Sequence, residues 1–164
     1  HRAKRGDFTR FLSHLKDGIA NSQYFQKGLL KKYELQDINF DIQEISDYGL
    51  KDYLSIISNY DNEKPHLAII EIPDRFKALS DRDNPYYKIK AKLLSLEIPV
   101  QFVRSSTISN YTEYILNPLA LQIYAKLGGT PWVLPAQRSV DREIVIGIGH
   151  SWLRSTIYLS LIHI

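Results

Sequence analysis

The stretch that decides the fold opens with NPYYKIKAKLLSLEIPVQF (residues 84–102) and closes with NPLALQIYAKLGG (residues 117–129). Its first part predicts a helix that starts just after the proline, followed by a short strand over Ile98–Val103. Its last part predicts a second helix, because Asn117-Pro118 suits an N-cap and a first helical position, and Gly128-Gly129 suits a helix end. Helix, strand and helix in this order favour an α/β fold.

The polar side chains of this stretch include a set without a carboxylate: Tyr86, Lys90, Gln101 and Lys126. Tyr86 and Lys90 lie four residues apart on one helix face, near an N-terminus whose free N–H groups suit a phosphate. Gln122 and Lys126 share a face of the closing helix, away from its apolar stripe. A single lysine at such a place is most often a solvated charge, so the inference rests on the whole set. The stripe expected to be buried consists of Ala120, Ile123, Tyr124 and Leu127.

The residues before this stretch predict further elements of an open α/β sheet. Helical spacing of apolar residues alternates with strand-like runs, which is the pattern of β-α-β units. The predicted helices are Phe8–Asp17, Tyr24–Tyr33 and Tyr48–Tyr60, and the predicted strands are Ile38–Ile45 and His66–Ile72.

The last 30 or so residues read as a separate part of the chain. One domain is expected up to about Pro135, followed by a polar linker, Ala136–Arg142, and a strand over Glu143–Ile148. The end, Ser155–Ile164, reads as a strand-like apolar run without a sheet to join.

Composition limits the classes of function. The 164 residues are 44% hydrophobic, enough for one good core, and the net charge of +3 permits a nucleic-acid partner without demanding one. The absence of cysteine excludes disulfides and fits a reducing cytoplasm, and no apolar run is long enough to span a membrane. Because the chain starts with His and contains no Met, we expect it to be a piece of a longer protein.

The set Tyr86, Lys90, Gln101 and Lys126, together with the block AKLGGTPW, resembles the Argonaute family where its MID domain meets its PIWI domain. The resemblance implies a Rossmann-like MID domain at residues 1–135, with a parallel sheet flanked by helices. It implies a linker and the start of an RNase H-like PIWI domain at residues 136–164. Slicing members carry a metal-binding aspartate where this chain has Gly149, so the resemblance is to the short, nuclease-inactive prokaryotic group.

The resemblance implies a function for the polar set. The four residues would anchor the 5′-phosphate of a guide strand, with Gln122 as an additional pocket residue and Gln101 as an indirect ligand of a magnesium ion. In the loop Pro73–Asn84, Arg75 or Phe76 would contact the first base. The expected partners are a guide of RNA or DNA, a complementary target and an effector protein, in a cytoplasmic prokaryotic defence system without cleavage by this chain.

Two other readings stay open at this point. One is a guide-directed nuclease whose acidic site is displaced in sequence, although no aspartate stands within two residues of Gly149. The other is an α/β domain that binds a small phosphorylated ligand. The sequence leaves open the type of guide, the preferred first base and the identity of the effector.

Overall fold

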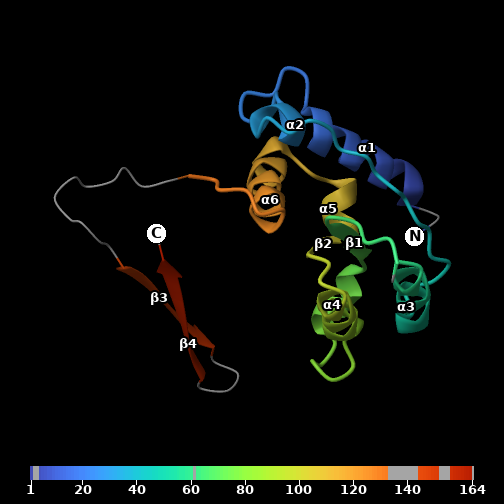
Figure 1. Cartoon of the computed structure of the whole chain (residues 1–164). Coiled ribbons are helices and arrows are strands. Elements are labelled where there is room, and N and C mark those ends of the chain that lie inside the picture. Colours follow the sequence, from blue (N-terminus) through green and yellow to red (C-terminus); the bar gives the residue numbers. More distant parts are fainter. Residues whose placement is uncertain (2–3, 61, 133–143, 152–155, 164) are drawn as a thin grey trace. The chain divides into compact units, whose positions relative to one another are not determined.

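The computed structural model describes residues 1, 4–60, 62–132, 144–151 and 156–163 (Figure 1). The chain divides into two compact units, His1–Pro131 and Trp132–Ile164. No helix in the described ranges is long and apolar enough to cross a membrane.

The first unit is built on two parallel strands, β1 (Ala68–Ile72) and β2 (Val100–Arg104), which lie side by side in Figure 1. Ala68 pairs with Val100 and Ile72 with Arg104. The connection between them contains a short 3₁₀ helix, η2 (Asp74–Ala78), and the helix α4 (Pro85–Ser95). A parallel pair needs such a crossover, because the chain must return to the same end of the sheet. The α/β prediction, with a parallel sheet flanked by helices, is confirmed.

Two apolar clusters form the core of this unit. One surrounds α1 (Arg5–Asp17), α2 (Gly28–Lys32) and α6 (Glu113–Lys126), and the other surrounds α3 (Leu50–Ser58) and α4. Ile69 packs against the first cluster and its neighbour Ile70 against the second, since successive side chains of a strand point to opposite faces. The sheet therefore separates the clusters. Side chains buried to less than 2% exposure include Phe11, Phe25, Leu15, Ile89, Ile98, Ile108, Leu116 and Ile123.

The closing helix starts one turn earlier than the sequence predicted. Thr112 is the N-cap of α6, and Pro118 lies inside the helix. Proline has no N–H, so the carbonyl of Tyr114 loses its helical partner, and Tyr114 is 66% exposed, where water can take that bond. Leu116 is fully buried, and its burial holds the additional turn against the core. The expected stripe is correct at Ala120 and Ile123, whereas Leu127 is exposed.

The segment Ile38–Ile45 is not a strand. Its alternation agrees with the burial of Ile38 and Ile42, which pack against the first cluster. It fails at Phe40, which is 37% exposed, and at Ile45, which belongs to the opposite face of the predicted strand but is buried in the second cluster. Its backbone, however, joins no ladder, because the sheet of this unit consists of β1 and β2 within the described residues. Alternation of apolar residues therefore predicts burial here only in part, and it carries no information about backbone partners.

Two other segments also differ from the prediction. Within Tyr24–Tyr33 only Gly28–Lys32 is helical, because Gly28 at φ +62° interrupts the pattern. The connection after β2, for which no helix was predicted, forms the short helix α5 (Ser105–Ser109).

The second unit contains an antiparallel pair, β3 (Ile144–Ser151) and β4 (Thr156–His163). The expectation that the terminal apolar run has no sheet to join is therefore wrong, because β4 pairs with β3 along its whole length. Gly149 lies in β3 opposite Tyr158. The predicted linker Ala136–Arg142 lies outside the described residues.

Candidate functional site

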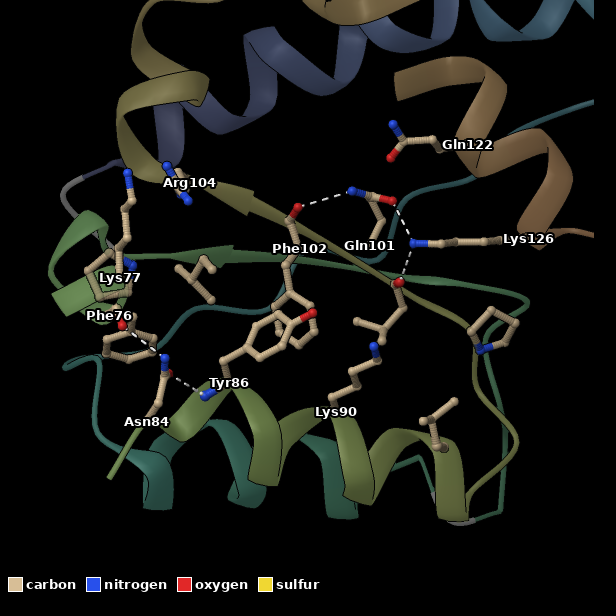
Figure 2. Close-up of a pocket in the computed structure, with 15 residues that line it drawn as sticks. Phe76, Lys77, Asn84, Tyr86, Lys90, Gln101, Phe102, Arg104, Gln122 and Lys126 are labelled. Carbon is tan, nitrogen blue, oxygen red and sulfur yellow. Dashed lines mark hydrogen bonds between the residues drawn. The ribbon is translucent and has the colours of Figure 1, made fainter. Parts of the chain in front are cut away.

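A pocket of about 590 Å³ runs along β2, from Pro99 and Val100 at its start to Arg104 at its end (Figure 2). All four residues of the predicted set line it, and so does Gln122. Its lining contains four cationic side chains and no carboxylate, so the site favours an anion. We call it the basic pocket. Its cationic residues are Lys77, Lys90, Arg104 and Lys126.

The start of α4 fixes Tyr86 and Lys90. Asn84 is the N-cap, and its side-chain oxygen accepts from the Tyr86 backbone N–H at 3.0 Å. Ile89, which is fully buried, sets the rotation of the helix, so that Tyr86 and Lys90 face the pocket. The Tyr86 ring packs on Phe102 of β2, with centroids 4.4 Å apart, and the Lys90 ammonium lies 5.8 Å from the Tyr86 ring centroid. Tyr86 and Lys90 therefore form one preorganised surface.

Lys126 reaches the pocket from α6 and is held by β2. Its ammonium donates to the carbonyl of Val100 at 2.7 Å and to Oε1 of Gln101 at 2.6 Å. The amide nitrogen of Gln101 donates to the carbonyl of Phe102 at 3.1 Å. Partial burial lowers the pKa of Lys126 below its ordinary value, and the positive charge of Lys90 lowers it further to a smaller extent. Both causes disfavour its charged form, and the opposite charge of a bound anion would offset both.

The glycines after α6 secure the end of the helix that carries Lys126. Gly128 has φ +87°, which suits glycine, and it follows the C-cap residue Leu127. A Cβ on Gly129 would lie 2.3 Å from the Tyr124 ring, so only glycine allows this close approach. The Gly-Gly pair therefore helps to fix the position of Lys126.

The two residues expected to contact a first base are placed differently from each other. Phe76 lines the pocket but is only 4% exposed, so its ring has little free surface for stacking. Arg75 is not among the lining residues, and its guanidinium carbon lies 5.8 Å from the Tyr48 ring centroid. The structure thus brings Tyr86, Lys90, Gln101, Gln122 and Lys126 together and leaves Arg75 apart from them.

Sequence reasoning missed three polar residues of the pocket: Lys77, Asn84 and Arg104. Arg104 ends β2 and Lys77 follows β1 in η2, and ligands of parallel sheets collect at such strand ends. That rule could have found both residues. The Asn84-Pro85 pair was also a usable N-cap signal, because here asparagine caps and proline takes the first helical position.

The donors in the pocket do not fit a magnesium ion held by the protein alone. Magnesium prefers carboxylate oxygens and water, and no carboxylate lines the pocket. Oε1 of Gln101, the oxygen expected to serve an ion, accepts from Lys126. No group of three metal-ligating side chains occurs elsewhere in the part of the chain that the structure describes.

Comparisons with known proteins agree on one family. The Piwi domain model matches residues 78–154, which include Tyr86, Lys90, Gln101 and Lys126. A protein argonaute of Cereibacter sphaeroides is 28% identical over 158 residues, which cover 88% of this chain and 20% of that protein. A Piwi protein of Archaeoglobus fulgidus is 42% identical over 66 residues, which cover 39% of this chain and 15% of that protein. The chain thus spans about a fifth or less of these relatives.

Proposed function

We propose that this chain, which belongs to the prokaryotic Argonaute family, anchors the 5′-phosphate of a nucleic-acid guide strand in the basic pocket. On this proposal residues 1–135 act as the MID domain and residues 136–164 begin the PIWI domain. The observation that carries it is a pocket with ammonium groups from two helices and no carboxylate. Family membership supports guide-directed binding of nucleic acid, and we take the basic pocket as the binding site for the end of the guide.

The proposed mechanism follows from which donors are still available. An ammonium group has three N–H donors, and Lys126 uses two of them on Val100 and Gln101. The third donor and the Lys90 ammonium are left for a terminal phosphate. Gln101 donates one amide hydrogen to Phe102, and its second hydrogen is available to a phosphate oxygen. The Oε1 atom of Gln101 holds Lys126, so the proposed mechanism does not use Gln101 as a ligand of a metal ion.

Tyr86 and Gln122 complete the proposed site. The Tyr86 hydroxyl points into the pocket in Figure 2, where it can donate to the phosphate. Its ring offers a surface for a nucleobase. Gln122 comes from the same helix as Lys126 and adds a neutral donor to the wall.

We further propose that the parent protein acts without cleavage by this part of the chain. Slicing members of the family are expected to have a metal-binding aspartate where this chain has Gly149 in β3, and glycine offers no side-chain ligand. A guide-loaded protein of this kind would act on a complementary target through an effector protein. We propose RNA as the guide, a cytoplasmic location and membership of the short, nuclease-inactive group.

The test is binding of a short labelled RNA that carries either a 5′-phosphate or a 5′-hydroxyl. The wild type should bind the phosphorylated strand about tenfold more tightly or better, because charged hydrogen bonds contribute about 1.5–3 kcal/mol each. The double variant Lys90→Ala/Lys126→Ala should lose this preference. The matched control is Lys27→Ala/Lys31→Ala, which removes two exposed lysines outside the pocket and should keep it. Equal binding of both ends by the wild type would contradict the proposal.

The same assay separates a guide from a small phosphorylated ligand. A guide binder should bind a phosphorylated oligonucleotide more tightly than a nucleoside monophosphate, because backbone phosphates add contacts. Equal affinity for the two would favour the small-ligand reading.

A further inference from the structure

The loop before α2 and the start of α6 present two exposed tyrosines that do not line the basic pocket (Figure 1). Tyr24 is 48% exposed and Tyr114 is 66% exposed, and their ring centroids lie 5.1 Å apart with an angle of 40° between the ring planes. Tyr114 and Lys126 are 12 residues apart in α6, which is about 18 Å along the helix axis. The tyrosine pair therefore lies well away from the pocket.

The backbone that carries Tyr24 is fixed by its neighbours. Phe25 is only 1% exposed, and its N–H donates to the hydroxyl oxygen of Ser22 at 2.8 Å. The Ser22 hydroxyl in turn donates to the carboxylate of Glu113, which ties the loop to the residue before Tyr114. The two exposed rings are thus held side by side before any ligand arrives, so binding costs little ordering of this surface.

Three lysines of α2 and its N-cap accompany the tyrosine pair. Lys27 and Lys31 are exposed, lie four residues apart and form no ion pair with a described residue. Lys32 donates to the amide oxygen of Asn117, a neutral partner three residues beyond Tyr114. We call this patch the tyrosine surface, and it consists of Tyr24, Lys27, Lys31, Lys32 and Tyr114.

The carboxylates of these segments leave the lysines in excess. Glu113 is half-buried and accepts from the loop hydroxyl, and Glu34 follows the end of α2. Three positive charges therefore face two negative ones, and one of the two negative charges is already engaged in a hydrogen bond.

The combination of exposed rings and lysines matches a single strand of nucleic acid. Unpaired bases stack on aromatic rings whatever their sequence, and the phosphates between them meet the ammonium groups. A double helix keeps the faces of its bases inside the stack and would leave both rings unused. An acidic protein segment would meet the lysines but would bring no flat groups for the rings. Membership of the Argonaute family makes nucleic acid a ligand of this chain.

We infer that the tyrosine surface is a second binding site for single-stranded nucleic acid, which accepts any sequence and does not recognise the 5′ end. Bases stack on Tyr24 and Tyr114, and Lys27 and Lys31 contact phosphates. The inference does not depend on 5′-phosphate binding, because the tyrosine surface shares no residue with the basic pocket. Its consequence is an affinity for strands without a 5′-phosphate, which the basic pocket alone does not explain.

The experiment measures binding of a labelled pyrimidine strand with a 5′-hydroxyl, both as a single strand and as a duplex. The wild type should bind the single strand more tightly than the duplex. Tyr24→Leu/Tyr114→Leu should weaken single-strand binding about tenfold or more, because stacking contributes about 1–3 kcal/mol per base. Tyr24→Phe/Tyr114→Phe keeps the rings and should bind as the wild type does. Tyr87→Leu is the matched control, because Tyr87 is 46% exposed and lies outside both sites.

The lysines are tested by the salt dependence of the same binding. Lys27→Ala/Lys31→Ala should reduce the salt slope by about 1.4, at about 0.7 for each lost phosphate contact. Circular dichroism shows whether each variant keeps the wild-type helix content. If the leucine variant does not fold, the salt slope decides, and an unchanged slope overturns the inference.

Three other results would also overturn the inference. They are wild-type binding by a folded leucine variant, equal losses in the leucine and phenylalanine variants, and equal binding of single strand and duplex by the wild type. Competition by a polyglutamate peptide as strong as that by unlabelled strand would assign the surface to an acidic protein and overturn it as well.

The ratio of affinities for 5′-phosphate and 5′-hydroxyl strands separates this inference from the proposed function. Lys27→Ala/Lys31→Ala should weaken both strands by the same factor and so keep the ratio. Lys90→Ala/Lys126→Ala should lose the ratio, while its binding of 5′-hydroxyl strands stays sensitive to Tyr24→Leu. A wild type without any 5′-phosphate preference would contradict the proposed function, and the leucine and phenylalanine variants would still decide this inference.

Discussion

Two cavities among the described residues of the His1–Pro131 unit are similar in volume and differ in their charged side chains. The basic pocket measures about 590 Å³, and a second cavity, which we call the β1 cavity, measures about 630 Å³. The β1 cavity is lined mainly by apolar side chains of both core clusters and by the segment from Gln36 to Gln43. It contains the carboxylates of Asp37, Asp41 and Glu71 and no lysine or arginine, whereas the basic pocket contains four cations and no carboxylate.

This difference shows that the local distribution of charge, and not the total, identifies the site. The whole chain has a net charge of only +3, too small to point to nucleic acid. The cations of the basic pocket come from four separate elements: Arg104 ends β2, Lys77 lies in η2, and Lys90 and Lys126 come from α4 and α6. The β1 cavity lies among the apolar clusters and contains three carboxylates, so a phosphate there would lose its hydration and be repelled.

The largest expected effect comes from reversing the charge of Lys126 in the basic pocket, compared with neutralising Asp41 in the β1 cavity. Lys126→Glu places a carboxylate beside Lys90 and the bound phosphate, and should weaken binding of a 5′-phosphorylated strand by about 100-fold or more. Asp41→Asn in the β1 cavity should leave binding unchanged, because its carboxylate accepts from Tyr60 and Gln43 and faces no ligand. Fluorescence anisotropy with labelled RNA measures both.

Lys126→Met separates a charge effect from a folding effect. It removes the donor without adding a carboxylate, and should lose the 5′-phosphate preference while circular dichroism shows the wild-type helix content. If Asp41→Asn weakens binding as much as the Lys126 variants, the contrast between the two cavities is wrong.

The sequence predicted much of the basic pocket because helical and strand periodicity constrain it. Tyr86 and Lys90 share a face of any helix that buries Ile89, and Lys126 lies off a stripe that buries Ile123. Lys77 depends on how the loop after β1 folds into η2, which no period specifies. The failure at Ile38–Ile45 has the same cause, since pairing to a sheet is a tertiary interaction.

The start of α6 shows how a strong local signal loses to packing. Asn117-Pro118 is a good helix start by itself, and the same pattern at Asn84-Pro85 does begin α4. In α6 the burial of Leu116 stabilises one more turn, which outweighs the hydrogen bond that Pro118 cannot make. Sequence spacing alone does not distinguish the two cases.

A smaller effect is expected at Gly129, which secures a helix that contributes to both cavities. Lys126 of α6 lines the basic pocket, and Ile123 and Leu127 line the β1 cavity. Gly129→Ala forces a methyl group against the Tyr124 ring and should lower the free energy of unfolding by about 2 kcal/mol. Chemical denaturation measures this loss.

The control for Gly129 is Gly128→Ala, where a Cβ meets no atom within 4 Å and the cost comes only from φ +87°. It should destabilise the fold by about 1 kcal/mol, the cost of placing a residue with a Cβ in the left-handed region. Gly129→Ala/Tyr124→Leu should recover part of the loss, because the smaller side chain makes room. A larger loss at Gly128 than at Gly129 would show that backbone conformation, rather than the close approach to Tyr124, requires glycine here.

The smallest effect is a pH dependence with opposite signs for binding and for stability. Partial burial and the charge of Lys90 lower the pKa of Lys126 from its ordinary value of 10.5. A bound phosphate favours the charged form, so the 5′-phosphate preference should fall as pH rises through the lowered pKa. Without a ligand, the unfolded chain binds the proton of Lys126 more tightly than the folded chain does. The contribution of Lys126 to stability therefore rises with pH over the window between the lowered pKa and 10.5.

Two variants test this pH dependence. Lys90→Ala removes one of the two causes of the lowered pKa and should move the loss of binding to higher pH, and Lys126→Met should abolish both pH dependences. If the pH dependence of binding is identical in the wild type and in Lys90→Ala, the two lysines do not share one ligand. That result would contradict the proposal that Lys90 and Lys126 bind the same phosphate.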